Sequence, residues 1–534
     1  MCNYAHYSLF DALAAFAIKL SEKESVKLLT TRALVNDTRK LKANDIFCAV
    51  IGEQQDGREY IDQAIKLGAT VILAECTKAD QHGHFNYGRV GNKNAIVIQF
   101  YQLNFHLFAL CQHYYQHPQQ NITMIGVTGT NGKTSTCQII AKLLQATQQS
   151  CSVLGTLGAG NVDALTPLAN TTPGATELHH YLNEFKAKGI ENLAMEVSSH
   201  ALSQRRLTND IIDIAVFTNL SRDHLDYHQT MNAYSAAKKT IFSSTGEQIA
   251  VLNIDDSQAQ QWLTHWPQSQ PYLVYARCEV SKAKQHSCYL VAENISHNQQ
   301  GVSFDLVTHL GSKKINSPLL GDFNIDNLLA AIAVVIAKST NENSEFNLDK
   351  LSAAIGQLTS VTGRMETFSD ESQQARKPTA VVDYAHTPDA LKNALRACRE
   401  HCQGDLWVVF GCGGDRDKGK RSLMGEVAEN GADHIVITND NPRGEAPELI
   451  ATDILAGCKY PEKITVMLDR KQAVLATLAK AKMGDLVLLA GKGHENHIII
   501  GDQKIDYNER AVVKSFYQQH HKILGNAPNI EENS

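Results

Sequence analysis

The 534-residue chain lacks an excess of basic residues, an uncharged apolar run of membrane-spanning length, and any cysteine spacing typical of a metal site. Its 50 Lys and Arg against 56 Asp and Glu give a formal net charge of −6. That balance provides no basic surface for nucleic acid or an anionic membrane, so we predict no nucleic-acid partner and no membrane insertion. The twelve scattered cysteines indicate free thiols in a reducing compartment, and we expect a cytoplasmic protein.

The N-terminal segment differs from a signal peptide. Residues 1–20 have an apolar centre without a basic n-region, and Asp11 interrupts it. We therefore expect a helix that docks on the first domain, not a signal peptide. The polar residues 525–534, GNAPNIEENS, are predicted to be a disordered tail.

The length of the chain predicts about three domains, because one hydrophobic core does not extend over this many residues. A polar stretch at 113–121 is typical of a linker, and we predict a second boundary near Thr362. We place the domains at residues 1–117, 118–361 and 362–534. The segment from about 253 to 320 is polar and irregular and gives no functional prediction.

Strand and helix patterns alternate along most of the chain, which predicts α/β domains with mostly parallel sheets. Helices are predicted at about 132–147 and at 348–358. Strands are predicted at 122–128, 193–197, 214–220, 379–384, 406–411, 434–438 and 486–491.

The strongest motif lies in residues 126–145, where an apolar strand enters a glycine-rich turn and then an amphipathic helix. Glycines let successive N–H groups point inward, and the helix N-terminus adds its positive dipole end, which favours phosphate binding. Lys133 would reach the β- and γ-phosphates, and the Thr134 hydroxyl would bind Mg²⁺. The loop is shorter than the usual Walker loop, and a turn that merely caps a helix is the alternative. That alternative leaves the Lys-Thr pair unexplained. The predicted nucleotide contacts are Gly129, Thr130, Asn131, Gly132, Lys133, Thr134 and Ser135.

Two further residues are candidates for a magnesium–nucleotide site, which needs additional oxygen or imidazole ligands. Glu196 ends the apolar run at 193–197, and His224 follows the run at 214–220. Either residue alone is more often an exposed side chain at a strand end. Together, after two strands of one predicted sheet, they favour a metal site.

Residues 440–443, Asp-Asn-Pro-Arg, follow the predicted strand at 434–438. They lie at the sheet edge where open α/β sheets bind ligands. Pro442 fixes one backbone angle, and Arg443 offers a planar fork that suits a carboxylate or a phosphate. The tetrapeptide alone is equally compatible with a strand-ending turn whose Arg is solvated.

Many ordered motifs in the chain resemble the Mur ligases of peptidoglycan synthesis. Beside GTNGKT (129–134) they are NTTPG (170–174), EVSSHAL (196–202), NLSRDHLDYH (219–228), LLGDFNIDNLLAA (319–331), GRME (363–366), DYAHTPDAL (383–391), GCGGDRDKGKR (411–421), DNPR (440–443) and GKGHE (491–495). The resemblance implies an N-terminal α/β domain that binds a UDP-sugar, a central P-loop domain that binds ATP, and a C-terminal Rossmann-like α/β domain that binds an amino acid.

The same resemblance implies a reaction. ATP and Mg²⁺ would drive the addition of meso-2,6-diaminopimelate to UDP-N-acetylmuramoyl-L-alanyl-D-glutamate through an acyl phosphate, and we expect a monomer. The alternatives are a lysine-adding member of the family, folylpolyglutamate synthase, and a P-loop regulatory NTPase without ligase activity.

Catalytic and nucleotide-binding roles are also implied by the resemblance. The catalytic residues would be Lys133, Glu196, His224 and Lys238, and the magnesium ligands would be Thr134, Glu196, His224 and Lys238. The family pattern places a carbamylated lysine at Lys238, because a carbamate offers metal ions two anionic oxygens. A solvated lysine on a polar helix face is the alternative. Asn327 would contact the adenine, Arg364 the nucleotide and Asp383 the ribose.

The remaining implied residues bind the two substrates that are joined. The UDP-sugar contacts would be Thr38, Asn170, Thr171, Thr172, Ser198, Gln204 and Arg206. Arg443 would bind the second carboxylate that distinguishes diaminopimelate from L-lysine, because lysine would leave such a donor unpaired. The rest of this pocket would be Arg416, Asp440, Asn441, Pro442, Gly491 and Glu495.

Overall fold

The computed structural model describes residues 8–19, 32–52, 55–242, 247–298, 301–341, 346–369 and 377–524. The tail that we predicted to be disordered lies outside these residues. The chain packs as two compact units. The first comprises residues 1–275, 281–289 and 330–346, and the second comprises 276–280, 290–329 and 347–534. The first unit therefore contains the whole predicted N-terminal domain and most of the predicted central domain, and our three domain boundaries stay predictions.

The N-terminal part of the first unit is a five-stranded sheet with helices on both faces. Its order is β1-β2-β3-β5-β4, and only β4 runs antiparallel to its neighbour. Alternate residues of β2 point to opposite faces: Ile46 packs with α1 and α4, whereas Phe47 packs with α3. The elements are α1 (Leu9–Ala14), β1 (Leu34–Val35), β2 (Ile46–Ala49), η1 (Gly57–Tyr60), α3 (Ile61–Leu67), β3 (Val71–Cys76), η2 (Ala79–Gln81), β4 (Phe85–Val90), β5 (Lys93–Tyr101), α4 (Leu103–Tyr114) and η3 (Pro118–Asn121).

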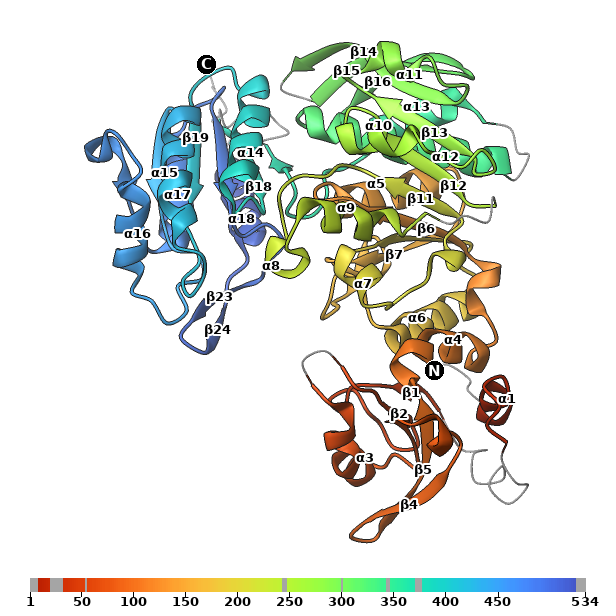
Figure 1. Cartoon of the computed structure of the whole chain (residues 1–534). Coiled ribbons are helices and arrows are strands. Elements are labelled where there is room, and N and C mark those ends of the chain that lie inside the picture. Colours follow the sequence, from red (N-terminus) through yellow and green to blue (C-terminus); the bar gives the residue numbers. More distant parts are fainter. Residues whose placement is uncertain are drawn as a thin grey trace, which may run out of the picture. The chain divides into compact units, whose positions relative to one another are not determined.

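The second part of the first unit is a larger sheet whose strand neighbours run β13-β12-β11-β6-β10-β7-β8-β9. The pairings from β12 through β11, β6 and β10 to β7 are parallel, and these strands are buried along their whole length except at Thr123. Near-continuous apolar strands of this kind are typical of a sheet covered on both faces. Helix α5 packs against β6, β7 and β10 (Figure 1).

This part of the first unit confirms the strands and the helix that we predicted there, with bounds shifted by one to three residues. Its elements are β6 (Thr123–Thr128), α5 (Lys133–Ala146), β7 (Cys151–Gly155), β8 (Gly158–Asn161), β9 (Ala164–Thr166), α6 (Ala175–Ala187), β10 (Asn192–Glu196), α7 (Ser199–Ser203), η4 (Asn209–Ile211), β11 (Ile214–Phe217), α8 (Leu225–His228), α9 (Met231–Lys239), β12 (Ile249–Asn253), α10 (Ser257–Leu263), β13 (Tyr272–Ala276) and α11 (Val280–Ala283).

The description of the segment at 253–320 as irregular was wrong. Within the second unit it forms an antiparallel meander of β14 (Tyr289–Asn298), β15 (Gly301–Thr308) and β16 (Gly311–Ser317). The strands were overlooked because polar side chains fill their solvent face, so that buried and half-buried positions alternate along β15. Helices α12 (Asp322–Asn341) and α13 (Leu348–Gly356) follow. The window Asp322–Thr340 is long and apolar enough to cross a membrane, but 78% of it is buried inside the fold, as in the core helix of a globular domain.

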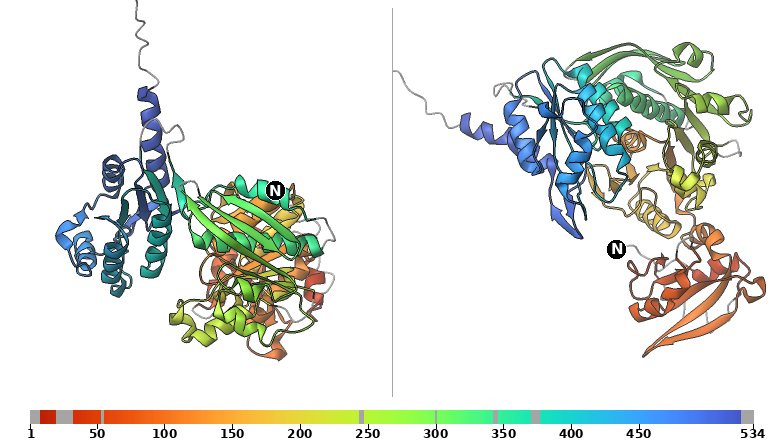
Figure 2. Two further views of the ribbon diagram at one scale, coloured as in Figure 1. Left: turned by 90° about the horizontal axis from the view of Figure 1, so that it is seen from above. Right: turned by 60° about the vertical axis from the view of Figure 1, so that its left-hand side comes forward.

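The C-terminal part of the second unit is a six-stranded sheet of order β17-β18-β22-β19-β20-β21, parallel except for β17. Residues of α14, α15 and α16 cover one face, and residues of α17 and α18 cover the other (Figure 2). Its elements are β17 (Glu366–Phe368), β18 (Thr379–Asp383), α14 (Pro388–His401), β19 (Leu406–Phe410), α15 (Gly419–Gly431), β20 (His434–Ile437), α16 (Pro447–Leu455), η5 (Pro461–Lys463), β21 (Thr465–Val466), α17 (Arg470–Lys480), β22 (Leu486–Ala490), β23 (His497–Ile500), β24 (Gln503–Asp506) and α18 (Glu509–Leu524).

A fully buried ion pair joins the first residues of α17 and α18. The side chains of Arg470 and Glu509 are both 0% exposed. Arg470 Nη2 donates to Glu509 Oε1 at 2.9 Å and to the Ala490 carbonyl, at the end of β22, at 2.8 Å. The guanidinium therefore fixes both helix starts to the edge of the sheet that follows β22.

We predict that Arg470→Met lowers the free energy of unfolding by about 3–5 kcal/mol, because Glu509 is then left buried without a counter-charge. Urea denaturation measures the loss. The double variant Arg470→Met/Glu509→Met should recover part of it, and Lys471→Met, which alters the exposed neighbour, should change little. Equal losses in the single and double variants would contradict this assignment.

Candidate active site

The turn between β6 and α5 has the backbone of a phosphate loop. Gly129 has φ +153° and Gly132 has φ +87°, both in the region that favours glycine. A Cβ at Gly129 would lie 1.9 Å from Thr218 Oγ1, so a larger residue does not fit there. α5 then begins at Lys133, with Thr134 and Ser135 in its first turn. The local geometry agrees with the predicted nucleotide contacts.

The segment that follows β11 holds this loop in place. Asn219 accepts from two loop amides: its carbonyl from Thr130 N at 2.8 Å and its side-chain Oδ1 from Asn131 N at 2.9 Å. Thr130 Oγ1 accepts in turn from Ser221 N at 3.0 Å. Sequence reasoning did not single out Asn219, although it opens the motif NLSRDHLDYH. Its role depends on the pairing of β11 with β6, which only the fold provides.

Two lysines converge on one carbonyl oxygen of the loop. Lys133 Nζ and Lys238 Nζ each donate to the Gly129 carbonyl at 2.8 Å. Lys238 is only 1% exposed, whereas the adjacent Lys239 is exposed, so the alternative of a solvated lysine at position 238 was wrong. Burial and the nearby Lys133 ammonium lower the pKa of Lys238 well below its ordinary value. Lys133 therefore places an ammonium at the loop, whereas a positive charge on the buried Lys238 amine is disfavoured.

Glu196 is a buried carboxylate without a counter-charge. It is 2% exposed at the end of β10, and it accepts from Thr156 N at 2.8 Å and from Thr156 Oγ1 at 3.2 Å. Among the described residues it forms no ion pair. A Cβ at Gly155 would lie 2.2 Å from Glu196 Oε1, so Gly155 makes room for this carboxylate. A buried unpaired carboxylate is costly unless a cation joins it, and Glu196 therefore fits a metal ligand.

His224 lies at the start of α8 with φ +52°, in the left-handed region. Its ring centroid is 4.9 Å from that of His200, and its Nε2 is 3.4 Å from Asp223 Oδ2. Burial lowers the pKa of His224, as do Lys133 and Lys238, while Asp223 opposes the shift. A neutral imidazole is the form that binds metal ions, so His224 also fits the predicted role.

A large cavity of about 2160 Å³ lies beside this site within the first unit. Segments from two parts of the sequence, within residues 32–63 and 167–206, line it, and they include the predicted substrate residues Thr38, Asn170 and Arg206. Its cationic side chains are Arg32, Arg39, Lys40, Lys42, Lys188 and Arg206, and its carboxylates are Asp37, Asp45, Glu177 and Glu184. Arg39, Lys40 and Lys188 are paired with three of these carboxylates, so the cavity is large and its lining has only a small excess of positive charge.

A chain of contacts connects Arg206 to the Glu196 site. Arg206 donates to Gln204 Oε1 at 2.6 Å and to the Thr172 carbonyl at 3.1 Å. Thr172 Oγ1 donates to the Glu196 carbonyl at 2.8 Å and accepts from Ser198 N at 3.0 Å. The structure thus brings together four predicted substrate residues. Thr171 joins the cluster through Thr156, whose hydroxyl lies 3.1 Å away. Thr156 itself belongs to no motif that we recognised.

The predicted ribose and nucleotide residues lie close together in the second unit. Asp383 accepts from the Met365 and Ala385 amides, both at 2.8 Å, and burial raises its pKa although Arg364 opposes the shift. The Arg364 guanidinium lies 4.7 Å from the ring centre of Tyr384, and its buried Nε has no hydrogen-bond partner among the described residues. Asn327 donates to Asn324 Oδ1 at 3.1 Å on α12.

The DNPR residues follow β20 and face loops that follow β19 and β22. Arg443 has φ +50°, and its Nη1 donates to the Gly414 carbonyl at 2.9 Å. Its Nε and Nη2 make no hydrogen bond within the described part of the chain. Pro442 is buried and Arg416 is exposed. Gly491 has φ +109°, and a Cβ there would lie 2.9 Å from Asp440 Oδ2.

Arg421 binds a carboxylate, Glu445, that lies beside the loop of Arg443. Arg421 on α15 is buried and donates from Nη2 to Glu445 Oε1 at 2.8 Å and from Nη1 to Glu445 Oε2 at 3.0 Å. These contacts hold the pKa of Glu445 down at about 2. Glu445 Oε1 also accepts from Asp415 N at 2.6 Å, so one carboxylate ties the loop of Arg416 to the loop of Arg443.

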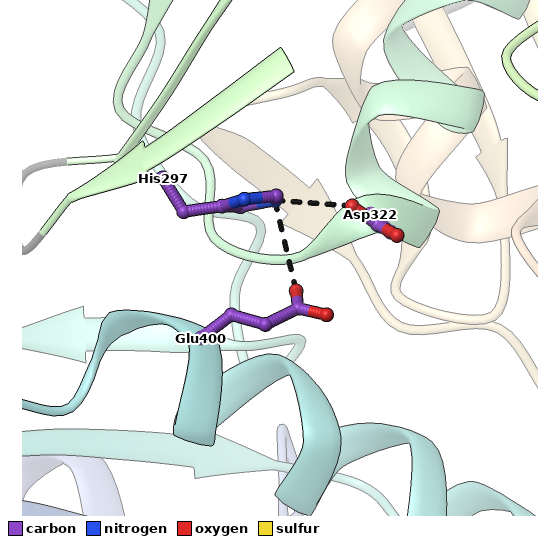
Figure 3. Close-up of side chains that lie close together, drawn as sticks. All are labelled: His297, Asp322 and Glu400. Carbon is purple, nitrogen blue, oxygen red and sulfur yellow. Dashed lines mark hydrogen bonds and ion pairs between the residues drawn. The ribbon is translucent and has the colours of Figure 1, made fainter.

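Three side chains elsewhere in the second unit are close enough to suggest a metal site: His297, Asp322 and Glu400 (Figure 3). His297 Nε2 lies 3.0 Å from Asp322 Oδ1 and 3.6 Å from Glu400 Oε2. Arg277, however, is 2.8 Å from Asp322 Oδ2, and Arg396 is 3.4 Å from Glu400 Oε1. Because guanidinium groups already neutralise both carboxylates, we interpret the cluster as an ion-pair network that joins β14, α12 and α14.

Comparisons with known proteins agree with this arrangement. Three family models match successive parts of the chain: "Mur ligase family, catalytic domain" at residues 31–103, "Mur ligase middle domain" at 127–335, and "Mur ligase, glutamate ligase domain" at 363–493. A Haemophilus influenzae (strain Rd) protein named UDP-N-acetylmuramoyl-L-alanyl-D-glutamate–2,6-diaminopimelate ligase is 41% identical over 483 residues. That alignment covers 90% of this chain and 95% of the relative. The chain belongs to the Mur ligase family.

Solved structures place this Mur ligase in the same fold. A structure of a UDP-N-acetylmuramoyl-L-alanyl-D-glutamate–2,6-diaminopimelate ligase matches with a TM-score of 0.64 and 34% identity, covering 92% of this chain and 95% of that one. MurF ligase from Thermotoga maritima in complex with ADP matches with a TM-score of 0.59 and 20% identity, covering 93% and 99%, which shows the fold alone.

The predicted three-domain α/β class of this Mur ligase is confirmed, and the regulatory NTPase alternative was wrong. The individual site residues stay predictions.

Proposed function

We propose that this Mur ligase uses ATP to join meso-2,6-diaminopimelate to UDP-N-acetylmuramoyl-L-alanyl-D-glutamate in the cytoplasm, acting as a monomer. One observation carries the choice of amino acid. Arg443 of DNPR presents two guanidinium nitrogens, Nε and Nη2, that make no hydrogen bond to any described residue, at the carboxyl edge of the C-terminal sheet. The 41% identical relative whose name specifies 2,6-diaminopimelate supports the same choice.

The reaction begins at the phosphate loop. The D-glutamyl carboxylate attacks the γ-phosphorus of ATP, the bond from this phosphorus to the β–γ bridging oxygen breaks, and an acyl phosphate and ADP result. An anion that attacks an anionic phosphate needs its repulsion neutralised. Lys133 begins α5 beside the loop amides, so its ammonium can leave the Gly129 carbonyl for the transferring phosphate.

Amide formation follows. The amine of diaminopimelate attacks the acyl carbon, the tetrahedral intermediate expels inorganic phosphate, and the amine loses its proton. Water would hydrolyse the acyl phosphate, so the site has to exclude it until the amine arrives. The buried environment of Glu196 and Lys238 supports such a role for the loop side of the site.

Thr134, Glu196, His224 and Lys238 would hold Mg²⁺. The fit rests on the buried Glu196 carboxylate, which has no ion-pair partner among the described residues, and on the buried Lys238. An ammonium at Lys238 would repel a cation, whereas a carbamate formed from CO₂ would supply two anionic oxygens. Bound magnesium would neutralise charge on the transferring phosphate. Asn327, Arg364 and Asp383 would contact the adenine, the nucleotide and the ribose.

The cavity beside the loop would hold the UDP-sugar dipeptide. Thr38, Asn170 and Arg206 line it, and Gln204 and Thr172 hold the Arg206 guanidinium in a fixed orientation. Thr171 and Ser198 connect this group to Glu196. Such an arrangement would place the negative charges of the precursor near cations in a protein whose overall charge is negative.

A direct assay tests the proposed reaction. Purified protein is supplied with ATP, magnesium and UDP-N-acetylmuramoyl-L-alanyl-D-glutamate, and the release of phosphate is followed with diaminopimelate, with L-lysine or with neither. We expect a tripeptide product with diaminopimelate and far less with lysine. Equal turnover with lysine would favour the lysine-adding alternative, and absence of any peptide product would overturn the proposal.

We predict that Arg443→Ala raises the KM for diaminopimelate between about tenfold and about a hundredfold, the effect of losing a charge-assisted hydrogen bond to the second carboxylate. The KM for ATP should not change. Arg443→Lys is the matched variant, because it keeps the charge but removes the planar fork. Its KM for diaminopimelate should lie between the values of the wild type and of Arg443→Ala. An unchanged KM for diaminopimelate in Arg443→Ala would refute the role.

We also predict that Lys238→Ala abolishes most activity, whereas Lys239→Ala, which alters the exposed neighbour, keeps it. ¹³C NMR of wild-type protein in ¹³C-enriched bicarbonate should show a carbamate signal that is absent from Lys238→Ala. Normal turnover by Lys238→Ala would show that this lysine is not a ligand of the site.

A further inference from the structure

The acceptor pocket contains a buried cation to which no role has been given so far. Lys492, the second residue of GKGHE, is 0% exposed between Gly491 and Gly493. Its ammonium lies 3.0 Å from Asp440 Oδ1 and 3.0 Å from Glu495 Oε2. It also donates to Asn441 Oδ1 at 2.8 Å and to the His497 carbonyl at 3.1 Å. One ammonium thus contacts three residues that we assign to the substrate.

These contacts decide how Asn441 is oriented. Its Oδ1 accepts from Lys492 Nζ and also from Ile499 N at 2.9 Å, so the carbonyl end of the amide is fully engaged. The amino end must then point the other way, and Nδ2 donates to Glu495 Oε2 at 3.0 Å. Without Lys492, the amide would lose one of the two donors that determine which end faces the pocket.

The contacts also give the two carboxylate oxygens of Glu495 different surroundings. Oε2 accepts from both Lys492 and Asn441. Oε1 accepts no hydrogen bond from any described residue, so it is left for a ligand. The cluster of Asp440, Glu495 and Lys492 has two negative charges and one positive charge. It therefore lacks one positive charge, which the ammonium at the far end of an amino-acid substrate would supply, while Arg443 is placed for the carboxylate.

We propose that Lys492 is the positioning residue of the acceptor site: its ammonium holds Asp440, Asn441 and Glu495 in the arrangement that selects an amino acid with a zwitterionic far end. The inference rests on the proposed function and deepens it. A buried lysine that only stabilised the domain would make the same contacts, so the experiment has to separate positioning from folding.

The test measures KM and kcat for Lys492→Met and Lys492→Gln with each of the three substrates. Lys492→Met removes the charge and every hydrogen bond, whereas Lys492→Gln keeps an N–H donor for Asn441. We expect Lys492→Met to raise the KM for diaminopimelate between about tenfold and about a hundredfold, the range for buried hydrogen bonds from a charged group. The KM values for ATP and for the UDP-sugar dipeptide should be unchanged, and Lys492→Gln should show a smaller rise.

A second readout is the preference for diaminopimelate over L-lysine, taken as the ratio of their kcat/KM values. This preference should fall in Lys492→Met, because the groups that recognise the zwitterionic end are no longer fixed. Lys504→Met is the matched control: it removes an exposed lysine from strand β24, and it should keep all KM values and the preference.

The outcomes distinguish failure of the proposed function from failure of the role proposed for Lys492. If the wild-type protein forms no tripeptide, the proposed function fails. If the wild type is active but Lys492→Met changes only kcat or the amount of folded protein, with KM and preference unchanged, Lys492 is structural and the inference is overturned. Failure of both variants to fold, as judged by thermal melting, would likewise show a structural role and overturn it.

Discussion

The parallel pairing of β11, β6, β10 and β7 is the constraint on which the loop side of the site depends. Parallel strands bring their carboxyl ends to one edge of the sheet, so residues far apart in the chain meet there. The phosphate loop follows β6, Asn219 follows β11, Glu196 is the last residue of β10, and Thr156 follows β7. The second unit repeats the principle: Asp383 is the last residue of β18, and Arg443 and Gly491 follow β20 and β22 of the same parallel sheet.

Local charge, not the charge of the whole protein, provides anion binding in this molecule. The chain is net negative, yet the Lys133 ammonium lies against the phosphate loop, and Arg206 is held at the wall of a large cavity. Two groups of the predicted sites have unequal numbers of opposite charges around them. Glu196 has no ionic partner among the described residues, whereas Lys492 is surrounded by two carboxylates. Each of these sites therefore has one negative charge that a cationic group of a ligand or a metal ion could balance. Burying such a charge is unfavourable, because water would otherwise solvate it.

Sequence reasoning succeeded where a short segment carries its own physical signal. The phosphate loop needs glycines and a Lys-Thr pair in consecutive positions, and buried parallel strands are continuous apolar runs, so both were predicted with small shifts in bounds. It failed for β14–β16, whose polar solvent face hides the strand period. It also failed for Thr156, Asn219 and Lys492, because each contacts a residue 40 or more positions away in the chain.

What the sequence alone determined is the chemistry available: a nucleotide loop, candidate metal ligands, and an arginine stiffened by proline, in the order typical of one enzyme family. Only the tertiary structure decided which of two lysines is buried against the loop, that Glu196 has no counter-charge among the described residues, and that one ammonium contacts Asp440, Asn441 and Glu495. The physical reason is that burial and pairing are properties of packed neighbours. Lys238 and Lys239 are the same residue type in adjacent positions, and the packing of α9 alone makes them different.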